Sequence, residues 1–130
     1  MFKFRGTRPG NLGVRDGKLA ACANKPNSVC SQAQGIHAIA PLRFSGDAGA
    51  AMRKLAALVR GLPRTEIIES RPDYLYAEFS TPLMGFVDDV EFHSDGGVIH
   101  VRSASRLGYS DLGVNRKRIE AIREAFERGV

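Results

Sequence analysis

Residues 86–106 read FVDDVEFHSDGGVIHVRSASR, in which two stretches rich in apolar residues flank the tight-turn sequence HSDGG. This arrangement predicts a β-hairpin, because a short Gly-containing turn joins two antiparallel strands. With Asp95 and Gly96 as the two turn residues, the apolar side chains of both strands share one face of the sheet. The pairs expected on this face are Phe92–Ile99, Val90–Val101 and Asp88–Ser103, and those on the other are Glu91–His100 and Asp89–Arg102.

Asp88 and Asp89 lie side by side in the first of these strands, so their side chains point to opposite faces of the sheet. Asp89 is expected on the outer, solvated face, where exposed cross-strand ion pairs contribute only about 0–1 kcal/mol each. Asp88 is expected on the inner face, beneath a helix, as a structural buried carboxylate. The substitution Asp88→Ala is therefore expected to destabilise the fold more than Asp89→Ala.

A buried carboxylate needs hydrogen-bond donors or must stay protonated, because an unpaired charge is unfavourable in an apolar interior. The candidate donors for Asp88 are Ser103, Ser105, an arginine of the last segment, and the backbone N–H groups at the start of the last helix. We favour the helix start, since the N-terminus of a helix attracts a carboxylate.

Two helices are expected, at 48–60 and 116–127, because apolar side chains recur there at helical spacing. Asp47 and Asn115 stand immediately before these ranges and are the expected N-caps.

Three further strands are expected, and Pro41 places the first at a sheet edge or a bulge, because proline cannot donate a ladder hydrogen bond. These strands are 36–44, 65–70 and 74–81. The order β-α-β-β-β-β-α predicts an α+β fold, an antiparallel meander with both helices packed on one face. Residues 1–34 are expected to form a basic, irregular arm, and residues 35–130 a single α+β domain.

The chain has 130 residues, of which 43% are hydrophobic and 25% charged, as in an ordinary globular protein of one domain. It has no apolar run of the roughly 20 residues that span a bilayer, and its start does not read as a signal peptide. The sequence as written predicts a cytoplasmic protein without an integral membrane segment, or an exported protein if a leader has been removed.

The net charge of +5 is distributed unevenly. Residues 1–25 hold six basic side chains and one acid, whereas residues 66–95 hold eight acids and one arginine. Either the basic ends lie against the acidic middle, or they bind a polyanion or a membrane surface. Nucleic acid is not expected as a partner, because the sequence has no helix-turn-helix, zinc-finger or RNP pattern.

Cys22 and Cys30 lie in a polar loop and could form a disulfide, although a cytoplasmic chain would favour free thiols. Neither a metal nor a cofactor is expected. His37 alone does not complete a metal site with the cysteines, and Glu91 and His100 provide only two convergent ligands.

The loop before the last helix, LGYSDLGV at 107–114, is the expected binding site together with nearby arginines. Backbone N–H groups and side-chain donors of such a loop can hold a phosphate or a carboxylate. The alternative is an ordinary capped loop whose arginines pair with Asp88, Asp89, Glu91 and Glu120. The expected binding residues are Arg102, Arg106, Tyr109, Ser110, Asp111, Asn115 and Arg116.

The sequence favours a non-catalytic module that binds a small ligand, in particular an anion, or a protein. An open sheet face carrying Tyr74 and Tyr76 would suit a partner, unless the basic arm folds across it. The alternative is an enzyme that uses the partly buried Asp88 with arginine partners.

The motifs GFVDDVEF, IHVRSASRLGYSDLGVNRKRIEAIR and RPGNLGVRDGKLAACANKPNSVCSQA resemble the bacterial and plastid family catalogued as domain of unknown function 1499. The resemblance covers nearly the whole chain and implies a small stand-alone domain with no assigned activity. In the family's cysteine loop, which resembles C-P-x-x-P-N-C-V-S-S, Cys22 matches the first cysteine and Ser28 stands at the second. A disulfide carried over from the family would therefore need this loop to bring Cys30, two residues later, near Cys22.

Overall fold

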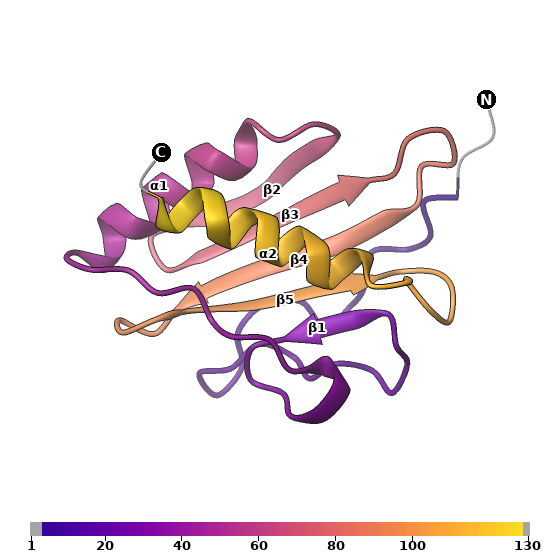
Figure 1. Cartoon of the computed structure of the whole chain (residues 1–130), viewed down its shortest axis with the longest axis horizontal. Helices are drawn as coiled ribbons and strands as arrows, with labels where there is room; N and C mark the ends of the chain where they lie inside the picture. Colours follow the sequence, from indigo (N-terminus) through magenta and orange to yellow (C-terminus); the bar gives the residue numbers. More distant parts are fainter. Residues whose placement is uncertain (1–3, 129–130) are drawn as a thin grey trace.

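The computed structural model describes residues 4–128 and consists of a five-stranded antiparallel sheet with two helices on one face (Figure 1). This confirms the predicted α+β fold, with neighbouring strands in the order β1-β5-β4-β3-β2. The predicted arm and domain also include residues 1–3 and 129–130, which lie outside the described residues. No helix within residues 4–128 has the length and apolar character to cross a membrane. The elements are β1 (Ser28–Cys30), the 3-10 helix η1 (Gly35–His37), α1 (Ala48–Arg60), β2 (Thr65–Arg71), β3 (Tyr74–Ser80), β4 (Val87–Ser94), β5 (Ile99–Ser105) and α2 (Val114–Glu127).

The two helices bury the apolar stripes that their residue spacing predicts, and these stripes form the core against the sheet. α1 begins as expected, because the carboxylate of Asp47 accepts a hydrogen bond from the Ala50 backbone N–H at 2.7 Å. The buried apolar helix side chains are Ala51, Met52, Leu55, Ala56, Val59, Ile119, Ile122 and Phe126.

The predicted strand at 36–44 is wrong. The edge strand β1 lies earlier, at Ser28–Cys30, in a segment expected to be irregular, and it pairs with β5. Residues 36–44 instead contain part of η1 and isolated bridges such as Leu42 to Ile99. Pro41 has no N–H to donate, which prevents a continuous ladder along this segment.

The hairpin of β4 and β5 is confirmed, but its predicted register is wrong by two residues. Ser94 pairs with Ile99, so the turn contains four residues, 95–98, rather than two. The Asp95 carboxylate shapes this turn by accepting hydrogen bonds from the N–H groups of Gly97 (2.8 Å) and Val98 (3.0 Å). Because the shift is even, every side chain stays on its predicted face. The observed pairs include Phe92–Val101, Val90–Ser103, Asp88–Ser105, Glu91–Arg102 and Asp89–Ala104.

The sheet face opposite the helices is covered by residues 4–27, the N-terminal arm that precedes β1, which passes behind the sheet in Figure 1. Leu19 of the arm packs on Tyr74 and Tyr76, and all three are buried. The expectation of a solvated outer face is therefore wrong, and Asp89 on that face is only 1% exposed. The structure follows the alternative in which the arm folds across this face.

A disulfide joins Cys22 to Cys30, with Cα atoms 6.3 Å apart. It links the part of the arm that precedes β1 to the last residue of that edge strand. Such a crosslink restricts the unfolded chain and thereby favours the folded one.

Reduction of this disulfide is expected to lower the free energy of unfolding by about 2–3 kcal/mol, because the unfolded chain regains the entropy of a short closed loop. Urea denaturation with and without dithiothreitol measures this loss. A Cys22→Ser variant is the control and should not respond to dithiothreitol. Two reactive thiols in the folded, oxidised protein would contradict the disulfide.

Candidate functional site

The carboxylate of Asp88 is buried beneath α2, with 4% of the residue exposed. Its Oδ2 atom lies 2.7 Å from Nη2 of Arg118, and the Ser105 side chain is a second hydrogen-bond partner. Arg118 and Ser105, two of the donors considered from the sequence, therefore bind Asp88. The start of α2, which was the favoured donor, instead binds Asp111. Burial raises the pKa of the Asp88 carboxyl above its usual value, and Arg118 offsets part of this rise.

Asn115 does not cap α2, contrary to prediction, because the helix begins one residue before it. Asp111 accepts the hydrogen bonds of the helix start, from the backbone N–H groups of Gly113 (2.8 Å) and Asn115 (3.2 Å). The Asn115 side chain is fully buried, where it accepts from the Ser103 hydroxyl (2.6 Å) and donates to the backbone oxygen of Asn27 (3.1 Å). Asn115 therefore joins α2, β5 and the arm.

Arg106 neutralises buried acids on the arm side of the sheet. Its Nε lies 2.9 Å from Oδ2 of Asp89, and its Nη2 lies 2.5 Å from Oε2 of Glu78. Arg8 of the arm binds the same Glu78 carboxylate at 2.7 Å, and the Tyr76 hydroxyl donates to Asp89 at 2.5 Å. The hydrogen bonds to Asp89 raise the pKa of Arg106 above its usual value, although burial opposes this. The sequence analysis left open whether the nearby arginines bind a ligand or pair with acids of the chain. Arg106 pairs with an acid of the chain, Asp89.

The structure does not bring the seven expected binding residues into one exposed site. Arg102 and Arg106 are held in ion pairs on the arm side of the sheet, and Asn115 is buried on the helix side. Arg116 donates hydrogen bonds at 2.8 and 2.9 Å to backbone oxygens in the segment 36–38. Tyr109 and Ser110 are exposed, and Asp111 is half-buried, as are Arg106 and Arg116.

Two cavities lie beside the first turns of α2 and share the lining residues Thr81 and Val114. The larger, of about 340 Å³, is bounded by the end of α1, the end of β3 and α2. The smaller, of about 230 Å³, is bounded by the loops 81–86 and 106–113. Arg118 lines the larger cavity and its partner Asp88 lines the smaller, so the buried ion pair reaches both.

The larger cavity combines apolar walls with an unpaired cation. Arg64 lines this cavity and is exposed, and it forms no ion pair with any residue of 4–128. Its backbone φ of 52° lies in the left-handed region, and its carbonyl oxygen accepts a hydrogen bond from the Ser80 N–H at 2.9 Å. The apolar wall residues include Leu58, Leu62, Phe79, Ala121, Ile122 and Ala125.

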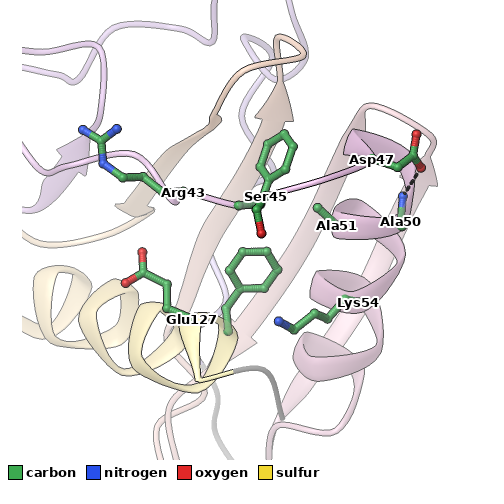
Figure 2. A pocket seen from close by; sticks show the side chains of 9 residues that line it. Arg43, Ser45, Asp47, Ala50, Ala51, Lys54 and Glu127 are labelled. Atoms are coloured by element: carbon green, nitrogen blue, oxygen red, sulfur yellow. Dashed lines mark hydrogen bonds between the residues drawn. The ribbon is translucent and has the colours of Figure 1, made fainter.

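A surface groove of about 520 Å³ lies between the start of α1 and the end of α2 (Figure 2). Its charged groups do not converge, because Asp47 caps α1 and Lys54 lies 4.7 Å from the ring centre of Phe126. Arg43 and Glu127 have opposite charges and give the groove no preference for one sign of ligand. Within residues 4–128, no three His, Cys, Asp or Glu side chains form a metal-binding group. The candidate site is therefore the 340 Å³ cavity.

Residues 18–126 match the profile of the family described as a protein of unknown function, DUF1499. The chain belongs to the DUF1499 family. This membership confirms the resemblance drawn from the sequence motifs. Comparison with curated proteins and with solved structures gives no match. The range shared with the DUF1499 family contains the described helices and strands except the last residue of α2, Glu127. It also contains Asp88, Asp89 and their arginine partners, whereas Arg8 of the arm precedes it.

Sequence reasoning on this DUF1499 domain missed Arg64. This residue follows Pro63, beyond the end of α1, and reads as an ordinary loop residue, so its position at a cavity depends on how α1 and α2 pack. Arg118 carries a clearer signal, because it lies three residues after Asn115 and one residue before the buried Ile119. Helical spacing therefore places Arg118 near the inner face of α2.

Both aspartates of the DUF1499 domain are expected to be essential to its stability. Asp88→Ala and Asp89→Ala should each lower the free energy of unfolding by about 3–5 kcal/mol, because each removes the buried carboxylate of an ion pair. Arg118 would lose its acidic partner, and Arg106 would keep only Glu78. Urea denaturation measures both losses. The control is Asp73→Ala, in an exposed turn, for which we expect a change within about 0.5 kcal/mol. If Asp89→Ala lowered the free energy of unfolding as little as the control does, the outer face would be solvated, as expected from the sequence.

The raised pKa of Asp88 predicts a defined pH dependence. The folded DUF1499 domain holds the Asp88 proton more tightly than the unfolded chain, in which the pKa is about 3.9. The stability that the neutral carboxyl contributes is therefore lost as the pH rises from this value through the folded-state pKa. We expect the free energy of unfolding of the wild type, minus that of Asp88→Asn, to fall as the pH rises between these two pKa values and then to level off. Denaturation at several pH values measures the difference, and a difference that rises with pH would show that Arg118 outweighs burial.

Proposed function

We propose that this chain is a non-catalytic binding module for a small amphiphilic anion. The apolar part of the ligand occupies the 340 Å³ cavity, and its anionic group pairs with Arg64. The observation that carries this proposal is an exposed arginine that lines an apolar cavity and forms no ion pair with the described residues 4–128.

The cavity has the properties of a small-molecule site. Its volume falls within the range of roughly 300–1,000 Å³ that is typical of ligand pockets. Leu58, Leu62, Phe79 and Ile122 supply apolar walls against which each buried methylene of a ligand would gain about 0.8 kcal/mol. A short acyl chain fits this chemistry.

The charge of the ligand follows from the two arginines of the cavity. Arg118 is already paired with Asp88 at 2.7 Å and lies 4.8 Å from the Phe79 ring centre. Arg64 has no such partner within residues 4–128, so its guanidinium is free to bind a carboxylate or phosphate through paired hydrogen bonds. The proposal keeps the anionic ligand class inferred from the sequence and moves the site from the last loop to the cavity bounded by the end of α1, the end of β3 and α2.

An enzyme that uses Asp88 is the second candidate, and one observation favours it. Asp88 lines the 230 Å³ cavity, and its pKa is raised by burial, as suits a general base. The same carboxylate is held in an ion pair with Arg118, however, which makes it a poorer proton acceptor. Binding without chemistry is therefore the stronger proposal.

Decanoate is a suitable probe of the 340 Å³ cavity, with binding measured by isothermal titration calorimetry. Arg64→Gln should weaken decanoate binding by about tenfold, because a charged hydrogen bond is lost. Decanol, which lacks the charge, should bind the wild type and Arg64→Gln equally. Ala121→Phe should block both probes by filling the cavity from an exposed position of α2.

The matched control is Arg43→Gln, the same substitution in the 520 Å³ groove, and it should leave decanoate binding unchanged. Equal affinity of wild type and Arg64→Gln for decanoate would refute the anion site. Loss of binding in Arg43→Gln alone would move the site to the groove of Figure 2.

A further inference from the structure

Apolar side chains are exposed together at one end of the sheet. Within residues 4–128, eight large hydrophobic side chains are exposed, and seven of them lie in or next to the loops 81–86 and 106–113. Both loops project from the right-hand end of the sheet in Figure 1. Soluble monomers rarely expose a large apolar patch without a binding role. We call this group the apolar rim: Leu83, Met84, Phe86, Leu107, Tyr109, Leu112 and Val114.

Two leucines of the apolar rim are held in an unfavourable backbone conformation. Leu83 has a φ of 68° and Leu112 a φ of 54°, in the left-handed region that favours glycine. Leu83 is 77% exposed and Leu112 is 86% exposed, so packing within the chain does not offset this strain. Strained backbone of this kind is concentrated at functional sites. The fold therefore presents two leucines to solvent where glycine would be easier to accommodate.

Contacts within the fold hold both loops in place. The backbone N–H of Thr81 donates to the backbone oxygen of Phe86 at 2.8 Å, and the Phe86 N–H donates to the Thr81 hydroxyl at 2.9 Å. The Phe86 ring stacks on Phe4 with 5.5 Å between ring centres. In the other loop, the side-chain amide of Asn27 donates to the backbone oxygen of Gly108 at 2.9 Å. The exposed side chains are thus displayed on anchored loops.

Unpaired basic side chains lie near the apolar rim. Lys25, Arg64 and Lys117 are exposed, and none of them forms an ion pair with a residue of 4–128. Lys25 lies next to Pro26, whose backbone oxygen accepts a hydrogen bond from the N–H of Asp111 in the loop 106–113. Arg64 lines a cavity together with Thr81 and Pro82, and Lys117 is in the first turn of α2. The acids that line pockets with Arg64 or with the rim are Glu66, Glu78, Asp88 and Asp111. Arg106 pairs with Glu78, Arg118 pairs with Asp88, and Asp111 accepts hydrogen bonds from the start of α2. This end of the chain is therefore net positive.

We infer that the apolar rim docks on a lipid bilayer that carries anionic headgroups, with Leu83 and Leu112 entering the interface. Interfacial binding needs apolar side chains that leave water and basic side chains that meet anionic lipids, and this end of the chain has both. A protein interface is instead built around a packed apolar centre with pockets. Here the apolar side chains stand on two separate loops.

Docking goes beyond the proposed ligand and does not depend on it. Val114 of the apolar rim lines both cavities, and Phe86 and Leu107 line the smaller one. A docked chain would hold both cavities at the bilayer surface, where amphiphilic anions are concentrated. Vesicle binding and decanoate binding are measured separately, so either proposal can fail alone.

The test is cosedimentation of the full chain with vesicles of phosphatidylcholine and with vesicles of equal parts phosphatidylcholine and phosphatidylglycerol. The wild type should bind the mixed vesicles more strongly, and added salt should weaken this binding. The double variant Leu83→Gly, Leu112→Gly should bind less by about tenfold for each leucine removed. Its melting temperature should equal or exceed that of the wild type, because glycine relieves both strained positions.

The matched control is Ile36→Ser, because Ile36 is the eighth exposed hydrophobic residue and lies outside the apolar rim. It should bind vesicles like the wild type. Wild-type protein that stays in the supernatant with both vesicle types would overturn the inference, as would vesicle binding that survives the double glycine substitution. A wild-type dimer in analytical ultracentrifugation that the double variant converts to monomer would assign the rim to a second copy of the chain and also overturn it.

Discussion

A carboxylate that leaves water must find a cation or strong hydrogen-bond donors, and this requirement governs both faces of the sheet. Asp88 and Asp89 are adjacent in β4, so they point to opposite faces and each needs its own partner. Arg118 of α2 pairs with Asp88, and Arg106 at the end of β5 pairs with Asp89. The arm closes the second face, and its Arg8 joins the same charge network. The two buried charges thus explain why the sheet is covered on both sides.

Local residue patterns predicted the helices, the hairpin and the α+β fold, because helical spacing and strand alternation depend on near neighbours in the sequence. The hairpin register was wrong because Asp95 stabilises a four-residue turn, a choice made by two hydrogen bonds rather than by the apolar pattern. The edge strand β1 was missed and a strand was expected at 36–44 instead, because a segment as short as 28–30 shows little periodicity. Cover of the outer face by the arm was only the alternative from the sequence, because buried tyrosines and acids read as an open polar surface.

The candidate site was harder to predict than the fold. Polar residues of the last loop and helix were expected to bind a ligand, yet the side chains of Asn115 and Arg116 form hydrogen bonds within the chain. Whether a donor is free depends on every element packed near it, and a sequence does not record this. Arg64 shows the converse: this ordinary loop residue has no ion-pair partner in the described part of the chain, and it lies beside a cavity that exists only after α1 and α2 have packed.

The pairing of β1 with β5 joins residues from opposite ends of the chain, for example Val29 with Ser103. Such distant pairs form slowly, because a long loop must close before the contact can stabilise the fold. A ribosome releases residues 28–30 well before residues 102–104 have been made, so this edge of the sheet cannot be completed until β5 has been synthesised. A segment that is made early therefore reaches its place late.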